Sequence, residues 1–195
     1  VASRKLEACV ALAEEITAAT GIKAAGFACN VARWEDCDRL VADVYDMFGT
    51  VDVLVNNAGS SPRYPSLAEV GEELFDKVIG LNLKGPFRLA ALVGTRMAAS
   101  GGGSIINVSS VGAVRVDPDA LPYCAAKAGL NTLTMGLARA FGPSVRVNGI
   151  MPGLFLTDIS QAWGEDVYAE QVKGIAAGRW LFINGNNTPR VARIE

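Results

Sequence analysis

The residues best suited to chemistry in this sequence are a tyrosine and a lysine four positions apart, Tyr123 and Lys127. On a helix this spacing puts both side chains on one face, one turn apart. A free tyrosine ionises at about pH 10, but a cation about 4 Å away stabilises its anion by roughly 4 kcal/mol. The pair therefore predicts a phenol whose pKa falls to about 7, where a general acid–base works best.

A serine that precedes Tyr123 by thirteen residues is the third candidate. Ser110 ends an apolar run, and its hydroxyl could donate a hydrogen bond to a substrate carbonyl while Tyr123 delivers a proton. The neighbouring Ser109 is the alternative, and the alternation of side chains along a strand predicts that the two serines point apart.

Composition excludes several other classes of site. The 195 residues contain no histidine, so neither a Ser-His-Asp nor a Cys-His system can form, and we expect no metal site. A hydrolase based on Ser110 or Cys124 would need Lys127 as its base. The net charge of −2 without a basic stripe argues against nucleic-acid binding. No apolar run reaches roughly 20 residues and no signal-peptide pattern is evident, so we expect a cytoplasmic protein without a membrane anchor.

The elements that must position these residues alternate along the chain. Helical spacing of apolar residues predicts helices over 4–20, 35–48, 67–99 (interrupted near Asn82 and Gly85) and 122–141, whereas short apolar runs predict strands over 1–2, 24–31, 51–55, 104–108 and 145–150. Strands that are apolar on both faces indicate a parallel sheet covered by helices. The sequence thus predicts an α/β fold, a Rossmann-type doubly wound parallel sheet in three layers, with 1–195 as a single, partial dinucleotide-binding domain.

Small and polar residues follow each predicted strand. In open parallel sheets ligands bind beyond the carboxyl ends of the strands, so these residues should face one crevice. They are Ser3-Arg4, Asn30, Asn56-Asn57-Ala58-Gly59, Ser109-Ser110 and Pro152-Gly153.

Five motifs, in order and at compatible spacing, resemble the short-chain dehydrogenase/reductases, in particular the 3-oxoacyl-carrier-protein reductases. They are Asn56-Asn57-Ala58-Gly59, Asn82 in LNLKGPF, Ser110 in INVSS, Tyr123-x-x-x-Lys127 and Pro152-Gly153-x-x-x-Thr157. The resemblance extends over roughly 1–157 and implies an oxidoreductase that transfers a hydride between a nicotinamide cofactor and a carbonyl or secondary alcohol.

The resemblance also implies catalytic roles. Tyr123 would be the acid–base, Lys127 would lower its pKa and bind the nicotinamide ribose, and Ser110 would polarise the carbonyl. Asn82 would kink its helix and hold a water that links Lys127 to solvent.

Further positions would bind the cofactor. Asn56, Ala58 and Gly59 would line its crevice. Asn30 and Val31 would lie beside the adenine, although the family more often has Asp in place of Asn30. The nicotinamide would contact Pro152, Gly153, Phe155 and Thr157.

The charge that follows the first predicted strand bears on cofactor choice. A basic residue at the end of the second strand of such a fold accommodates the 2′-phosphate of NADP, whereas an acidic one binds the ribose of NAD. Arg4, with Ser3 as an extra hydrogen-bond donor, therefore favours NADP(H) over NAD(H).

One family feature is missing. The TGxxxGxG loop that cradles the pyrophosphate at a helix N-terminus does not occur, so we expect a chain that lacks the first strand and this loop and is truncated at both ends. Such a chain would bind cofactor weakly.

Substrate and assembly are predicted less directly. The apolar residues Leu154, Phe155, Leu156 and Trp163 favour a 3-oxoacyl thioester substrate. A sugar or polyol dehydrogenase of the same family, or a non-catalytic nucleotide-sensing member of the fold, is the alternative. The family commonly forms dimers and tetramers, so we expect a homo-oligomer built through the helices that carry Asn82 and Tyr123.

Overall fold

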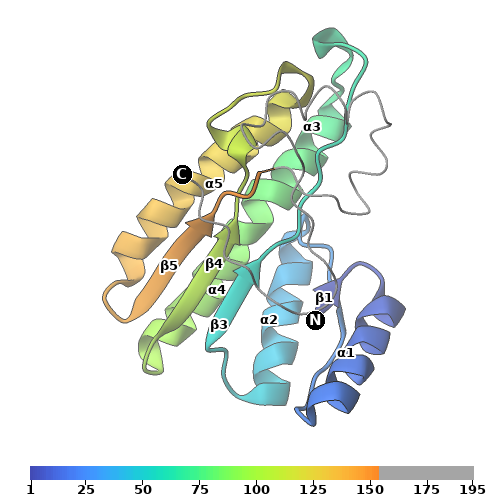
Figure 1. The fold of residues 1–195 in the computed structure, drawn as a ribbon. Coiled ribbons are helices and arrows are strands. Elements are labelled where there is room, and N and C mark those ends of the chain that lie inside the picture. The colour runs from blue at the N-terminus through green and yellow to red at the C-terminus, as the bar shows by residue number, and fades with distance from the viewer. Residues whose placement is uncertain (154–195) are drawn as a thin grey trace. The chain divides into compact units, whose positions relative to one another are not determined.

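The computed structural model describes residues 1–153. The chain divides into two units, Val1–Met151 and Pro152–Glu195, and every helix and strand named below belongs to the first. Within it, β1 (Ala2–Ser3) and β2 (Phe27–Ala28) form a two-stranded parallel sheet, and β3 (Val53–Asn56), β4 (Gly103–Val108) and β5 (Val145–Ile150) form a parallel sheet in that order (Figure 1). The predicted parallel α/β fold is confirmed.

Helices connect these parallel strands. They are α1 (Leu6–Thr20), α2 (Trp34–Phe48), α3 (Glu72–Ile79), α4 (Gly85–Ala99) and α5 (Leu121–Phe141), with short 3-10 turns η1 (Leu67–Glu69), η3 (Val111–Ala113) and η4 (Pro118–Ala120). The predicted ends of α1 and α2 are correct because a left-handed glycine ends each helix: Gly21 has φ 71° and Gly49 has φ 77°. No helix in the described part of the chain has the length and apolarity that crossing a membrane requires.

Two predicted elements differ from the structure. The strand expected over 24–31 shortens to Phe27–Ala28. It begins after Gly26, whose backbone packs so closely on α1 that a Cβ there would lie 2.6 Å from the main chain of Cys9 and Val10. The interruption expected near Asn82 is a π-helical turn, η2 (Gly80–Lys84), that joins α3 to α4. Such turns insert one extra residue and often mark functional sites.

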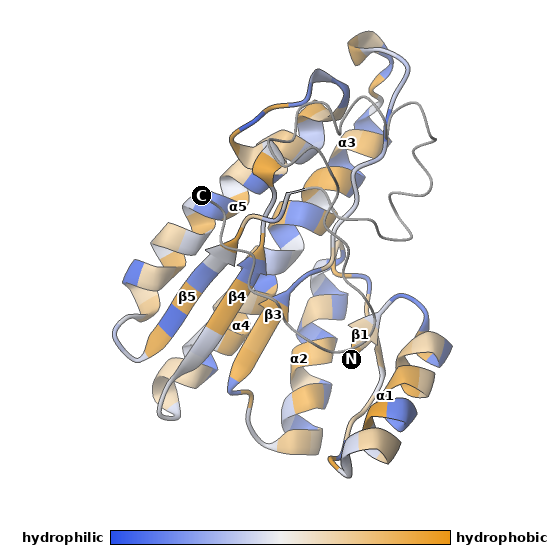
Figure 2. Cartoon of the chain, viewed as in Figure 1, coloured by the Kyte–Doolittle hydropathy of each residue, from blue (hydrophilic) through white to orange (hydrophobic). Residues whose placement is uncertain are grey.

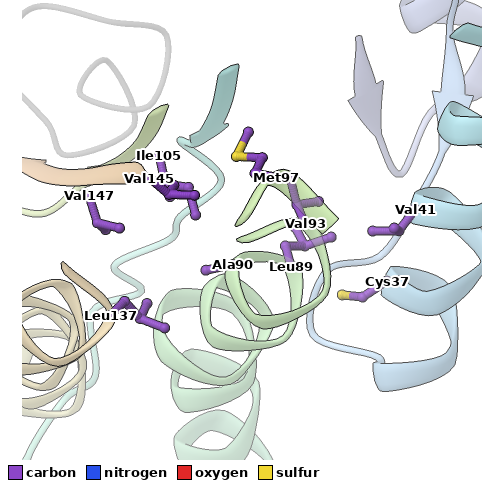
Figure 3. Close-up of a cluster of buried hydrophobic side chains, with 10 residues drawn as sticks. All are labelled: Cys37, Val41, Leu89, Ala90, Val93, Met97, Ile105, Leu137, Val145 and Val147. Atoms are coloured by element: carbon purple, nitrogen blue, oxygen red, sulfur yellow. The ribbon is translucent and has the colours of Figure 1, made fainter. Parts of the chain in front are cut away.

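The hydrophobic core lies between the three-stranded sheet and the helices α4, α5 and α2. Ala90 and Met97 of α4 and Ile105 of β4 are each 0% exposed, and Figure 3 shows these side chains meeting those of β5, α2 and α5. The strand ends that carry the candidate site are thus anchored on a packed layer of helices.

An apolar hollow of about 340 Å³ separates the two sheets. Its walls come from Val1 and Phe27 on one side, from Val53 on the other and from α2 beneath. Val53 and Val55 are 56% and 53% exposed, and Figure 2 shows β3 as an apolar strand. Within residues 1–153, β1 and β3 each pair along one edge, so the five strands form two sheets rather than one continuous sheet.

Candidate functional site

The N-terminal turn of α5 places Tyr123 and Lys127 together. Pro122 occupies the second helical position, where a missing N–H has no cost, and the helix brings the two side chains onto one face as predicted. The Lys127 Nζ lies 5.7 Å from the centroid of the Tyr123 ring and donates a hydrogen bond to the Val108 carbonyl at 2.7 Å. Lys127 is 3% exposed, so a potentially charged amine is buried at the end of β4.

Ser110 rather than Ser109 faces Tyr123. The Ser110 hydroxyl lies close enough to the Tyr123 phenol to act on its pKa, and it accepts a hydrogen bond from the Gly112 N–H at 3.0 Å. Ser109 is buried and donates to the Lys127 carbonyl at 3.3 Å. The alternation of side chains at the end of β4 therefore separates the two serines as predicted.

The pKa of Tyr123 moves in the direction opposite to the one predicted. Burial raises the pKa of Tyr123 above its ordinary value of 10, while the Ser110 hydroxyl acts in the opposite direction. Burial lowers the pKa of Lys127 from 10.5 to about 8. The sequence argument counted the attraction between the two groups but not the loss of water around them, which disfavours both charged forms.

Asn82 lies in the π-helical turn and is 0% exposed. Its amide group donates to the carbonyls of Ser60 and Val78, each at 2.9 Å, and accepts from the Ser60 N–H at 3.3 Å. The π-helical turn thus places the Asn82 side chain in contact with the backbone of Ser60, the residue after Gly59.

Gly59 packs against this buried pair of polar side chains. A Cβ at Gly59 would lie 2.9 Å from the Asn82 Oδ1 and 3.5 Å from the Lys127 Nζ. A side chain here would displace the Asn82 amide, so the motif that follows β3 needs glycine at this position. The structure therefore brings Gly59, Asn82, Ser110, Tyr123 and Lys127 into one cluster, named the Tyr123 cluster below.

Asn56 belongs to a separate buried network. Its amide donates to the Asn107 Oδ1 at 2.9 Å, and Asn107 donates in turn to the Thr134 Oγ1 at 2.9 Å. This chain of bonds ties β3 to β4 and to α5. The sequence reasoning missed Asn107 and Thr134, although a lone asparagine inside the apolar run of β4 was an available signal.

The predicted adenine-side residues form a compact turn after β2. The Asn30 N–H donates to Asp36 at 3.1 Å and its Oδ1 accepts from the Ala32 N–H at 3.2 Å. The π-helical turn packs on this segment, because a Cβ at Gly80 would lie 3.2 Å from Ala32. Asn30 and Val31 are therefore linked by packing to the segment that carries Asn82.

Ser3 and Arg4 end the neighbouring strand. The Ser3 hydroxyl is bonded within its own turn: it accepts from the Lys5 N–H at 3.2 Å and from the Cys9 thiol at 3.1 Å. Arg4 is exposed. Since β1 pairs with β2 in parallel, with Ser3 opposite Ala28, Arg4 and Asn30 follow paired strand ends.

The residues present fit a nicotinamide cofactor. Lys127 has three N–H donors, of which one is used by Val108, and Gly59 keeps the space beside its Nζ free of a side chain. Ala58 is exposed next to Gly59. Pro152 and Gly153 follow β5 after Met151 and belong to the second unit, while Phe155 and Thr157 lie outside the described residues.

Comparisons with known proteins bear on the family to which the chain belongs. A family profile described as short chain dehydrogenase matches residues 1–167. Dehydrogenase/reductase SDR family member 4 of Bos taurus is 40% identical over 155 residues, which are 78% of this chain and 56% of that protein. The NAD-dependent glycerol dehydrogenase of Listeria innocua is 34% identical over 153 residues, 77% of this chain and 60% of that protein. The chain thus spans somewhat more than half of these relatives.

Among solved structures, a variant of actinorhodin polyketide ketoreductase with NADPH superposes with a TM-score of 0.82 at 31% identity. The match covers 93% of this chain and 74% of that one.

Proposed function

Because the chain belongs to the short-chain dehydrogenase family, we propose that the full-length protein is an NADP(H)-dependent reductase with Tyr123 as its acid–base. The observation that carries the proposal is the Tyr123 cluster: a phenol beside the Ser110 hydroxyl, with the buried amine of Lys127 5.7 Å from the centroid of its ring. A bound nicotinamide cofactor would supply the hydride in this reaction.

Tyr123 is the proton donor in this proposal. Since burial raises its pKa, the phenol keeps its proton at neutral pH and can deliver it to the carbonyl oxygen of a substrate. In the reverse reaction, the oxidation of an alcohol, the same residue would accept the proton.

Ser110 and Lys127 assist in two different ways. The Ser110 hydroxyl orients the carbonyl and stabilises negative charge that develops on its oxygen. Lys127, whose pKa of about 8 lies close to neutrality, binds ribose hydroxyls with its free N–H donors and can return a proton to Tyr123. Asn82 fixes the Ser60 backbone beside them.

For the cofactor we propose NADP(H). Arg4 is exposed immediately after β1, where a cation can pair with a 2′-phosphate, and the actinorhodin ketoreductase is solved with NADPH. The NAD-dependent glycerol dehydrogenase keeps NAD(H) as the alternative, which binding measurements with both cofactors would decide.

For the substrate we propose a 3-oxoacyl thioester, supported by the polyketide ketoreductase. The glycerol dehydrogenase supports a polyol as the second candidate. We also propose a homo-oligomer formed through α4 and α5, where Phe87 and Met135 are exposed apolar side chains; sedimentation of the full-length protein checks this.

Deuterium transfer tests the proposed reaction. We expect NADPH deuterated on the nicotinamide ring to label the hydroxy product of a 3-oxoacyl thioester in the full-length protein. Label found only with NADH and polyol-derived ketones would select the alternative. NADPH binding without label in any carbonyl of a broad panel would contradict the enzyme and indicate a nucleotide sensor.

A further inference from the structure

Arg63 and Tyr64 connect the segment after Gly59 to the turn that precedes α5. The Tyr64 hydroxyl donates a hydrogen bond to the Pro118 carbonyl at 2.7 Å and accepts one from the Leu121 N–H at 2.9 Å. These groups are 54 and 57 positions apart in the sequence. We call this set of contacts, with those of Arg63, the Tyr64 clasp.

The clasp supplies a missing cap to α5. The first N–H groups of a helix have no acceptor within the helix, and the residue before α5, Ala120, makes no capping hydrogen bond with its side chain. Leu121 is the first residue of α5, and the Tyr64 hydroxyl accepts from its N–H. A side chain from a distant loop therefore does what a serine or aspartate usually does locally.

Arg63 reinforces the same contact more weakly. Its guanidinium lies 3.1 Å from the Asp119 carboxylate and 3.6 Å from that of Asp117. The three side chains are 36%, 67% and 42% exposed, and ion pairs at this exposure contribute little and are screened by salt. The hydroxyl of Tyr64 is thus the principal member of the clasp.

The middle of the connection from Ser110 to Tyr123 is exposed. Val114 and Val116 are 65% and 60% exposed, so this part is not anchored by packing, and the contacts of Arg63 and Tyr64 lie between it and α5. The arm that carries the clasp is stiff, because Pro62 and Pro65 flank it and a residue that precedes proline is confined to extended backbone.

We propose that Tyr64 is a positioning residue of the reaction, which acts by fixing the first turn of α5. Tyr123 lies two residues after Leu121 in that turn, so the clasp determines where its phenol stands relative to Ser110. The effect on turnover rests on the proposed function.

Tyr64→Phe removes both hydrogen bonds and keeps the ring. In the full-length protein with NADPH and a 3-oxoacyl thioester, we expect kcat to fall about tenfold, because small displacements of reacting groups are costly. KM and the Kd for NADPH should stay within about twofold, since the binding contacts are intact. Tyr45→Phe is the matched control: the Tyr45 hydroxyl is buried and has no hydrogen-bond partner among residues 1–153, so its loss should leave kcat unchanged.

Hydrogen–deuterium exchange gives a readout that does not depend on activity. Tyr64→Phe should raise exchange in peptides covering 117–125 but not in those covering 130–141, Arg63→Ala should do so less, and Tyr45→Phe should change neither. Unaltered exchange in Tyr64→Phe, or a rise that extends through all of α5, would overturn the positioning role. If Tyr64→Phe turns over as fast as the unsubstituted protein, only the positioning role is overturned. If the unsubstituted protein turns over none of the substrates tested, the proposed function is overturned as well.

Discussion

The region around Tyr123 and the region around α1 are built differently. Around Tyr123, the buried polar side chains of Asn82, Asn107 and Lys127 all have hydrogen-bond partners, and the strands beside them have four to six residues. Around α1, the two strands have two residues each, and Leu6 and Leu12 are each 43% exposed. Figure 2 shows hydrophobic and hydrophilic residues together on the visible side of α1.

This difference in packing coincides with a difference in proposed function, catalysis in one region and cofactor selection in the other. Of the residues proposed for catalysis, Asn82 and Lys127 are buried and hydrogen-bonded, so their positions are strongly determined. The residues proposed to select the cofactor lie beside short strands and an exposed helix, where local opening requires less free energy. Catalysis should therefore respond to substitutions that leave the fold intact, and cofactor choice should respond to surface charge.

The largest expected effect is on turnover. Tyr123→Phe removes the proposed proton donor, so kcat in the full-length protein should fall by about 10³-fold, while the Kd for NADPH changes little because the ring remains. Steady-state kinetics and calorimetric titration measure the two quantities. Turnover equal to that of the unsubstituted protein would reject Tyr123 as the acid–base.

The next effect is on stability. Asn82→Ala removes three hydrogen bonds and leaves the buried groups of Ser60 and Val78 without these partners, so the free energy of unfolding should fall by about 2 kcal/mol. Urea unfolding measures it. The exposed neighbour of Asn56, Asn57, serves as control: Asn57→Ala should change the free energy of unfolding by no more than about 0.5 kcal/mol. An equal loss in both variants would show that the hydrogen bonds of Asn82 do not contribute specifically to stability.

An effect of comparable size should appear with pH. The pKa of Lys127 is lowered from 10.5 to about 8 in the folded protein, so between these values the unfolded chain holds a proton that the folded one has released. The unfolded state then binds more protons, and stability rises with pH by at most about 1.4 kcal/mol per pH unit. The unfolding free energy of the unsubstituted protein, relative to Lys127→Met, should increase from about pH 8 to about pH 10. A constant difference would contradict the burial of the amine.

The smallest effect tests the α1 region. Arg4→Ala should weaken NADPH binding about fivefold, or about 1 kcal/mol, and leave NADH binding and stability unchanged because Arg4 is exposed. The weakening should diminish at high salt. Arg139→Ala, at an exposed arginine in the last turn of α5, is the control. Equal losses for NADPH and NADH would remove the assignment of Arg4 to the 2′-phosphate.

Much of the fold and part of the site were predictable. The bounds of α5 and β5 agree with the predicted 122–141 and 145–150 to within one residue, because helical periodicity and apolar runs are local signals. The side-by-side placement of Tyr123 and Lys127 and the choice of Ser110 follow from the same local geometry. The division into two sheets was not predictable in this way, since strand pairing joins segments that are far apart in the chain.

By itself, the sequence determined which residues could carry out proton transfer, the alternation of helices and strands, and the absence of any histidine chemistry. Only the tertiary structure decided the direction in which the pKa of Tyr123 moves, the partners of Asn82 and the capping of α5 by Tyr64. These depend on burial and on contacts between segments more than 20 positions apart, and spacing along a chain carries no information about either.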